Sequence, residues 1–388
     1  MSQAFSSRTN WDTSESPLSV AISGAGRGGQ VLHDLTQSNP TRCGFQYDSV
    51  AILGPLSSCD ALRYDPDPMG LPSARSAVSR YYLDHDADVP NENIVLTTST
   101  SEAYSFLFRL LCDPGDEVLV AQPGYPLFDF VATVEDVQLK QYNLFRDFGW
   151  WIDFHSLEQQ LSARTRAVIL VHPNNPTGHS TSPSQRKAVE QFCQRHNLAL
   201  IVDEVFLDFT IDEPIQSFAS GHHPCLTLIV SGISKIAALP QMKVGWIAAA
   251  GPAKPLSEAL SRLEVIADTF LSMSTPAQIA LPAWLASRHA IQPQIKERIN
   301  LNLALLKACP AIEVFPVEAG WSAIVRLSGM SPGPSLAEEL VREASVITHP
   351  GSFYGIPEQN RLVVSLLTPT KTLTAALHSL TQWCESNR

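Results

Sequence analysis

Two kinds of hydrophobic pattern alternate along the central part of the chain. Residues 73–85 have the period of an amphipathic helix, 93–99 form a short apolar run, and 101–112 are helical again until Asp113-Pro114-Gly115 ends the pattern. Further apolar, β-branched runs lie at 117–122, 167–173, 198–206, 226–231 and 244–250. Strands that are apolar throughout and alternate with helices form a mainly parallel sheet with both faces covered. The pattern therefore predicts an α/β fold whose large domain spans residues 46–255.

After Pro252 the chain changes to long helical periodicity and then to short apolar runs. These segments are 256–270, 294–309, 312–317, 321–327 and 361–367. Their order predicts a smaller α+β domain over residues 256–388. Residues 1–45 are polar and glycine-bearing at first, and we expect them to form an N-terminal arm followed by a segment of the small domain.

Composition narrows the class of protein. The chain has 388 residues, of which 44% are hydrophobic, so a sizeable core is available. A formal net charge of −11 argues against nucleic acid or an anionic membrane surface as a partner, because both select clustered Lys and Arg. No apolar run approaches the roughly 20 residues that cross a bilayer, and the first residues lack a signal-peptide core. The seven cysteines are scattered without metal or disulfide spacing, so we expect free thiols and a cytoplasmic location.

The residues best placed for chemistry follow three of the apolar runs. In open α/β sheets, ligands bind beyond the carboxyl ends of the strands. The run 167–171 leads into a Pro- and Gly-bearing loop that can aim the amide of Asn175. The run 198–202 ends at Asp203, and the run 226–231 leads to Lys235. Taken singly, an Asp after a strand is usually a helix cap and a Lys in a loop is usually solvated, so only their order points to a shared site.

Four motifs occur in a fixed order along the chain. They are Asn174-Asn175-Pro176-Thr177-Gly178, Asp203-Glu204-Val205-Phe206, Ser231-Gly232-Ile233-Ser234-Lys235 followed by Gly245-Trp246, and Asn360-Arg361-Leu362-Val363-Val364-Ser365. This combination resembles the fold type I, pyridoxal-phosphate-dependent aminotransferases of class I/II, from about residue 38 to residue 367. The resemblance implies a mainly parallel sheet flanked by helices, a smaller α+β domain, and pyridoxal 5′-phosphate as cofactor. It also implies transfer of an amino group between an L-amino acid and a 2-oxo acid through a Schiff base on Lys235.

The resemblance assigns a role to individual residues. Lys235 would carry the cofactor and then move a proton between the substrate Cα and the cofactor. Asp203 would keep the pyridine nitrogen protonated, so that the ring can accept an electron pair. Asn175 would donate to the ring hydroxyl and contact the substrate, and Arg361 would bind the substrate α-carboxylate through two hydrogen bonds. Tyr125 would stack on the pyridine ring.

The phosphate group is expected at a helix N-terminus. Ser99, Thr100 and Ser101 open the helix predicted over 101–112, where free backbone N–H groups and the helix dipole favour an anion. Tyr64 resembles the tyrosine that reaches the phosphate from a neighbouring subunit, which implies a homodimer with shared active sites. A packed surface aromatic is the alternative interpretation of Tyr64.

Three positions depart from the commonest family pattern. Lys243 stands where an arginine usually grips the phosphate, so a point charge replaces a planar fork. Phe206 replaces a tyrosine that would donate to the ring oxygen. Gly232 replaces a serine that often assists the phosphate, and the sequence leaves open whether Ser231 compensates. These changes affect cofactor tuning and leave the set of Lys, Asp, Asn and Arg in place.

Three alternative functions fit the sequence less well. Residues 24–29 match G-x-G-x-x-G with Asp48 about 20 residues on, as in dinucleotide-binding enzymes, but Pro40 leaves no room for the long helix that such a motif opens. A regulatory protein on the same fold would need a DNA-binding segment, for which this chain has no spare length. His222-His223 are adjacent and cannot both reach one metal ion from regular structure.

The type of reaction and the substrate stay open at this point. A C–S or β-lyase, a racemase or a cyclopropane-forming synthase uses the same scaffold, and the choice depends on which Cα bond lies perpendicular to the ring. Residues 320–322 and 349–354 flank strands that lead to Arg361, so we expect them to line the substrate pocket. Their aromatic side chains favour an apolar or aromatic amino acid.

Overall fold

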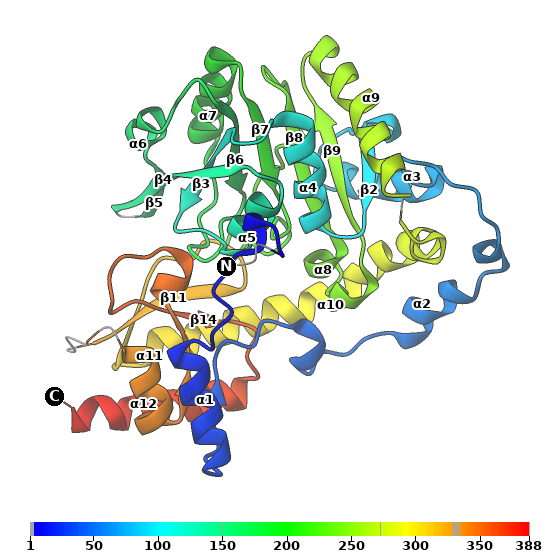
Figure 1. The fold of residues 1–388 in the computed structure, drawn as a ribbon. Coiled ribbons are helices and arrows are strands. Elements are labelled where there is room, and N and C mark those ends of the chain that lie inside the picture. Colours follow the sequence, from blue (N-terminus) through cyan, green and yellow to red (C-terminus); the bar gives the residue numbers. More distant parts are fainter. Residues whose placement is uncertain (1–3, 148, 272, 329–332, 334, 388) are drawn as a thin grey trace.

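The computed structural model describes residues 4–147, 149–271, 273–328, 333 and 335–387. An eight-stranded mixed sheet forms the centre of its larger part (Figure 1). In spatial order its strands are β2 (Ile94–Thr97), β9 (Gly245–Ala250), β8 (Thr227–Gly232), β7 (Ala199–Asp203), β6 (Thr165–Val171), β3 (Glu117–Gln122), β4 (Gln138–Asp147) and β5 (Gly149–Ile152). The five strands from β8 to β4 run parallel, and β9, β2 and β5 pair antiparallel. The predicted mainly parallel sheet is therefore confirmed.

Helices cover both faces of this sheet. The apolar side chains of the strands alternate between two core clusters, because successive residues of a strand point to opposite faces. One face packs on α4 (Thr100–Leu111), α5 (Leu127–Val134) and α9 (Ala253–Thr269). The other face packs on α3 (Pro72–Leu83), α6 (Phe154–Gln159), α7 (Pro183–His196) and the first half of α10 (Thr275–Ala308).

A four-stranded antiparallel sheet forms the smaller part. Its order is β10 (Ile312–Val314), β11 (Ser322–Leu327), β14 (Leu362–Ser365) and β13 (His349–Pro350). One face packs on α1 (Pro17–Arg27), α11 (Leu336–Glu339), α12 (Thr370–Ser386) and the second half of α10. Close by, β1 (His33–Asp34) pairs parallel with β12 (Val346–Ile347), which attaches the N-terminal segment to this part.

Short elements complete the described chain. They are η1 (Ser7–Thr9), η2 (Pro40–Arg42), α2 (Ser49–Leu53), η3 (Gly54–Ser57), η4 (Cys59–Leu62), η5 (Asn91–Asn93), α8 (Ile233–Ile236), η6 (Pro240–Met242), η7 (Leu340–Ala344) and η8 (Gly351–Tyr354). No helix among the described residues combines the length and apolar character needed to cross a membrane.

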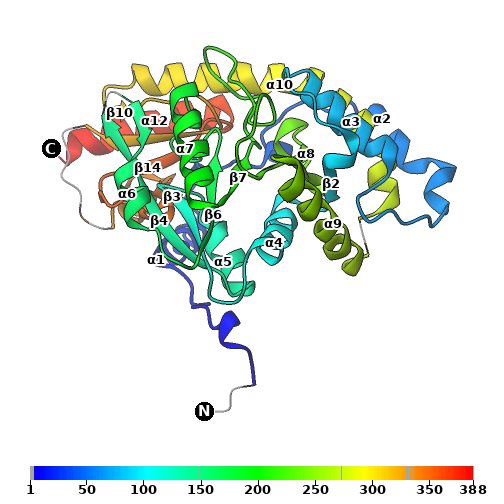
Figure 2. The ribbon, with the colours of Figure 1, turned by 90° about the horizontal axis from the view of Figure 1, so that it is seen from above.

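The long helix α10 joins the two parts. Its 34 residues extend about 50 Å, and both views show it passing from one part to the other (Figures 1 and 2). Ala277–Leu285 pack in the large core, whereas Ile291–Leu306 pack in the small one. The domain division expected near residue 255 stays a prediction, but the packing of α9 on the large sheet favours a boundary inside α10.

The N-terminal region contains more regular structure than its composition indicates. Residues 17–27 form helix α1, capped by Ser16 Oγ, which accepts a hydrogen bond from the N–H of Ser19. The glycine-rich residues 24–29 are thus the end of a helix on the small domain. Because no strand leads into them among residues 4–16 and only the two-residue β1 follows, the dinucleotide-binding alternative lacks its structural context.

Candidate active site

A cavity of about 470 Å³ lies at the carboxyl ends of β6, β7 and β8, between the large sheet and the small one. Nine of the eleven residues predicted for the site line it: Ser99, Thr100, Ser101, Tyr125, Asn175, Asp203, Phe206, Lys235 and Lys243. Five different segments of the large part bring them together. The other two predicted residues, Tyr64 and Arg361, lie outside the lining.

Asp203 is a buried carboxylate at the last position of β7. Its Oδ2 accepts a hydrogen bond from the Tyr104 hydroxyl at 3.0 Å, and its Oδ1 accepts one from the N–H of Val205 at 3.1 Å. Burial raises the pKa of Asp203 to about 6, against the opposing effect of these two hydrogen bonds and of Lys235. A positively charged N–H group bound beside Asp203 in the cavity would stabilise the ionised carboxylate and lower this pKa again. Tyr104 was missed from the sequence, since it reads there as a core position of α4.

Lys235 lies in α8, directly after β8. Its Nζ is 5.4 Å from the ring centroid of Trp321 and 6.0 Å from that of Phe206. Burial lowers the pKa of Lys235, and the charge of Asp203 partly offsets this effect. The uncharged amine is the nucleophilic form, so the surroundings favour the form that attacks a carbonyl carbon.

The loop after β6 presents Asn175 to the cavity. Asn174 Oδ1 accepts hydrogen bonds from the hydroxyl of Thr177 at 2.8 Å and from its N–H at 3.4 Å. Gly178 has φ +69°, and a Cβ there would lie 2.7 Å from the carbonyl oxygen of Ala319. The loop is therefore fixed by its own side chains and by close contact with the small part, while the amide of Asn175 makes no hydrogen bond to another described residue.

The N-terminus of α4 forms a wall of the cavity that is suited to an anion. Ser99 caps the helix by accepting from the N–H of Glu102 at 3.2 Å, and Glu102 accepts in return from the N–H of Thr98 at 2.6 Å. The N–H groups of the first helical turn have no partners within the helix and point to the cavity end of α4. Lys243 adds a positive charge from the neighbouring loop. A Cβ on Gly245 would lie 2.9 Å from the backbone of Ser99, so glycine lets β9 run against the helix start.

The position of Gly232 explains why no serine stands there. A Cβ at Gly232 would lie 2.8 Å from the carbonyl oxygen of Val244, which leaves no room for a side chain. Ser231 does not compensate, because it shares a strand face with Ile229 and points away from α4. Its Oγ is buried and has no hydrogen-bond partner among the described residues. In this chain, Lys243, the α4 N–H groups and the hydroxyls near them are the groups available for an anion.

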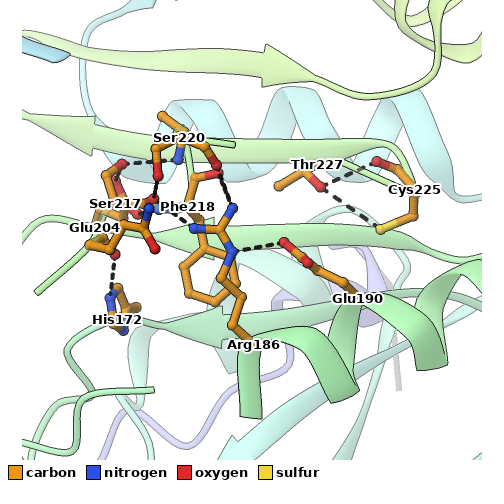
Figure 3. A network of polar contacts seen from close by, with 11 residues as sticks. His172, Arg186, Glu190, Glu204, Ser217, Phe218, Ser220, Cys225 and Thr227 are labelled. Atoms are coloured by element: carbon orange, nitrogen blue, oxygen red, sulfur yellow. Dashed lines mark hydrogen bonds and ion pairs between the residues drawn. The ribbon is translucent and has the colours of Figure 1, made fainter. Parts of the chain in front are cut away.

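A buried polar network holds the ends of β6 and β7 in place (Figure 3). Glu204, next to Asp203, accepts from the hydroxyl of Ser217 at 2.7 Å and from the N–H of Phe218 at 2.5 Å. Arg186 donates to the carbonyl oxygen of Ser217 at 2.8 Å and pairs with Glu190. Burial raises the pKa of Glu204 to about 7. The network fastens the loop around residue 217 behind β7 and so supports the position of Asp203.

His172 extends this network to the start of the Asn175 loop. Its Nδ1 accepts from the N–H of Thr181 at 3.1 Å, so its Nε2 carries the proton that is shared with the carbonyl oxygen of Gln216 at 3.2 Å. Burial lowers the pKa of His172 to about 3, which keeps the ring neutral. The predicted loop is thus anchored at both ends by buried hydrogen bonds.

Tyr64 and Arg361 are placed differently from the other nine residues. Tyr64 lies between η4 and α3 and is 79% exposed, away from the cavity of its own chain. The guanidinium of Arg361 stacks on the ring of Phe315, with 4.6 Å from Cζ to the ring centroid, and donates to Asn360 Oδ1 at 2.5 Å. Arg361 thus lies outside the cavity lining, and its contact with the substrate carboxylate stays a prediction.

Comparison with known proteins agrees with the architecture of this site. The family model for aminotransferases of class I and II matches residues 49–380. An alanine aminotransferase of Mycobacterium tuberculosis is 25% identical over 378 residues, which cover 93% of this chain and 87% of the relative. Nicotianamine aminotransferase 1 of Oryza sativa subsp. japonica is 26% identical over 359 residues, covering 87% and 71%.

Solved structures give the same fold. An aminotransferase from Escherichia coli superposes with a TM-score of 0.85 at 22% identity, covering 98% of both chains. The alanine aminotransferase of Pyrococcus furiosus gives a TM-score of 0.87 at 21% identity, covering 98% of this chain and all of the other. The family match spans most of the chain, and it includes the strands, the loops and the helix that build the cavity. The chain therefore belongs to the pyridoxal-phosphate-dependent aminotransferases of class I and II.

Proposed function

We propose that this cavity transfers an amino group between an L-amino acid and a 2-oxo acid, with Lys235 as the catalytic residue. The observation that carries the proposal is the convergence of Lys235, Asp203 and the N-terminus of α4 on one cavity. Each meets a different requirement of the reaction. Lys235 offers an amine, Asp203 offers a buried acidic partner, and the N-terminus of α4 offers an anion site. The names of the relatives favour amino-group transfer over the lyase, racemase and synthase reactions.

The residues present fit pyridoxal phosphate. Asp203 is a buried carboxylate that gains from a protonated ring nitrogen, and the α4 N-terminus with Lys243 suits the phosphate. Tyr125 and Phe206 offer aromatic surface beside Lys235. When bound there, the cofactor supplies a carbonyl carbon that captures amines and a ring that takes up an electron pair.

The protein residues then bind, orient and move protons. Lys235, whose pKa is lowered by burial, is the base that takes the proton from the substrate Cα and later returns it. The Tyr104 hydroxyl donates a hydrogen bond to Asp203, which fixes the orientation of the carboxylate. Asn175 is positioned by its rigid loop to donate its free amide into the cavity. The apolar side chains of Val171, Val205 and Phe206 exclude water around these groups.

A homodimer would complete the site. Val50, Leu62 and Tyr64 are 80%, 88% and 79% exposed along one N-terminal segment, which is an unusual concentration of apolar surface in water. A second copy of the chain on this surface would bury these residues. It would also bring Tyr64 to the phosphate site at the N-terminus of α4 in the neighbouring subunit. No disulfide joins any of the seven cysteines in the part of the chain that the structure describes, which favours the reducing conditions of a cytoplasm.

The proposed function is tested by following a labelled amino group. Purified protein with pyridoxal phosphate is given a panel of ¹⁵N-labelled L-amino acids with pyruvate or 2-oxoglutarate, and the products are analysed by mass spectrometry. We expect the label to appear in L-alanine or L-glutamate. Release of ammonia or of a thiol without labelled product would favour a lyase and overturn the proposal.

A further inference from the structure

Part of the cavity lining has no role toward the cofactor in the proposed function. It includes Thr36, His349, Phe353 and Tyr354, which come from the N-terminal segment, from β13 and from η8. Phe353 and Tyr125 are both 43% exposed, which makes them the most exposed large apolar side chains among the described residues of the lining. Their exposure shows where the cavity opens, and we call these five residues the rim.

Hydrogen bonds join η8 to the end of β3 and the loop after it, and so fix the shape of the rim. The N–H of Gly124 donates to the carbonyl oxygen of Tyr354 at 3.0 Å, and Gln122 Nε2 donates to the carbonyl oxygen of Gly355 at 2.7 Å. Gly355 has φ +75°, and a Cβ there would lie 2.5 Å from Gln122 Nε2, so glycine permits this close approach. Phe353 is therefore presented on a support that is formed before any substrate binds.

The aromatic rings of the rim pack on their neighbours and keep one side uncovered. The ring centroid of His349 is 5.7 Å from that of Phe353 and 6.0 Å from that of Tyr354. The Nδ1 of His349 and the hydroxyl of Tyr354 are 3.1 Å apart, within hydrogen-bond distance. On the side of α5, Tyr125 packs edge to face on Phe128. Burial of the uncovered surface by a further ring would be favourable, because aromatic pairs add to the gain from apolar area.

The formal charges of the cavity all have roles toward the cofactor. Among the described residues of the lining, the acidic and basic side chains other than histidine are Asp203, Lys235 and Lys243. The proposed function assigns them to the ring nitrogen, the carbonyl carbon and the phosphate. This part of the lining leaves no cation for a second carboxylate and no anion for an ammonium or guanidinium group. A substrate with an uncharged side chain fits it best.

The groups around His349 disfavour a second carboxylate at the rim. Burial lowers the pKa of His349, although the carboxylate of Asp34 opposes this effect, so the ring is neutral at neutral pH. Asp34 Oδ1 accepts from the N–H and the hydroxyl of Thr36 at 2.8 and 2.6 Å, which places a negative charge beside the rim. Burial raises the pKa of Tyr354 and of Tyr125, so both stay uncharged. The rim thus offers neutral rings next to a carboxylate.

We infer that the cavity takes amino acids and 2-oxo acids that have a single carboxylate, and that Phe353 selects an aromatic side chain on the amino acid. This inference rests on the proposed function, because it names the substrates of that reaction. The α-carboxylate keeps the partners already predicted for it. The same reasoning makes pyruvate, which has no second carboxylate, a better acceptor than 2-oxoglutarate.

Separate half-reactions test the choice of substrate. Protein loaded with pyridoxal phosphate is mixed with L-phenylalanine, L-alanine, L-aspartate or L-glutamate, and the change of its visible band gives a second-order rate constant for each. Protein loaded with pyridoxamine phosphate is mixed with pyruvate or 2-oxoglutarate in the same way. We expect L-phenylalanine to react about 10-fold faster than L-alanine and about 100-fold faster than either dicarboxylic amino acid. Pyruvate should react faster than 2-oxoglutarate.

Variants at Phe353 test the residue that selects the side chain. Phe353→Ala should lower the preference for L-phenylalanine over L-alanine about 10-fold, because the substrate ring loses its partner. Phe353→Leu, which keeps apolar bulk without a ring, should recover part of this loss. Phe130→Ala is the matched control, because Phe130 is 49% exposed on α5 but is not part of the lining. It should keep the wild-type preference.

Binding without turnover gives a second readout. Calorimetry with the loaded protein measures the affinity for 3-phenylpropionate and for glutarate, which lack the amino group and differ in the group at the far end. 3-Phenylpropionate should bind at least about 10-fold more tightly in wild type, and Phe353→Ala should reduce this difference. Equal affinities, or tighter binding of glutarate, would contradict the inference.

The outcomes separate this inference from the proposed function. If no amino acid changes the visible band, the proposed function fails and the inference fails with it. If the band changes but L-aspartate or L-glutamate reacts faster than L-phenylalanine, or Phe353→Ala keeps the wild-type preference, only this inference is wrong. Arg146, whose Cζ lies 4.3 Å from the ring centroid of Phe315, is outside the lining. A dicarboxylic preference that is lost in Arg146→Met would place the second carboxylate there.

Discussion

The two walls of the cavity are built in different ways. The large-domain wall consists of the carboxyl ends of parallel strands and the loops after them, where Asp203 is the last residue of β7 and Asn175 and Lys235 follow soon after β6 and β8. The small-domain wall consists of antiparallel strands, whose pairing brings Ser322 to Ser365 and His349 to Val363. Chemistry on the first wall follows from local motifs, whereas recognition on the second depends on register.

The largest effect is expected on the large-domain wall. Lys235→Ala removes both the amine and the base, so kcat for amino transfer should fall by about 10²–10⁴-fold or more. Steady-state assays with the best donor of the ¹⁵N panel measure this loss. Lys243→Ala is the matched control, because it removes a lysine from the same wall and should mainly weaken cofactor affinity. Activity of Lys235→Ala within tenfold of wild type would remove it from the chemistry.

A second effect concerns Asp203 in the cofactor-free protein. Its pKa is about 6 in the folded state and ordinarily about 3.8, so folding favours the protonated form. The stabilising contribution of the proton is present below the ordinary pKa and is lost as pH rises through 6. Relative to Asp203→Asn, wild type should lose on the order of 2 kcal/mol in free energy of unfolding between pH 4 and 7.5. Urea unfolding of both proteins across this pH range measures the difference in their free energies of unfolding. A difference that does not change with pH would contradict the raised pKa of Asp203.

The smallest effect is expected at Phe206, where the large-domain wall meets Trp321 of the small one. The two rings pack edge to face with centroids 5.5 Å apart, and Phe206 cannot donate to the cofactor oxygen as a tyrosine would. Asn175 is then the remaining predicted donor, so the cofactor imine should keep its proton to higher pH in wild type than in Phe206→Tyr. A pH titration of the visible band should show a midpoint lower by roughly one unit in the variant. An equal or higher midpoint would mean that position 206 does not face that oxygen.

The sequence predicted the large-domain wall better than the small one for a physical reason. A residue at or just after the end of a buried parallel strand, such as Asp203 or Lys235, lies at the carboxyl edge of the sheet. This position follows from the local sequence and does not depend on the rest of the fold. The partner of Asp203, Tyr104, is 99 residues away in sequence and reads as an ordinary core position of a helix. Its hydroxyl reaches Asp203 only when α4 packs on the sheet, so the sequence pattern does not predict this contact.

The small-domain wall shows what hydrophobic alternation and periodicity in the sequence do not predict. Alternation along β14 gives the face of each strand residue, but Arg361 lies just before the strand, so alternation does not place its side chain relative to the cavity. Likewise, the periodicity of α9 and α10 predicts two helices, but it does not reveal that α9 and half of α10 pack with the large sheet. Helix α1 was missed because its four consecutive small residues, 23–26, are typical of a flexible segment.

The most direct test of the central claim is the location of the cofactor bond. The protein is loaded with pyridoxal phosphate, reduced with borohydride and digested, and the modified peptide is identified by mass spectrometry. The account predicts one stoichiometric adduct on Lys235, with Lys243 and the other lysines unmodified. An adduct on another lysine, or none with the cofactor in excess, would contradict it.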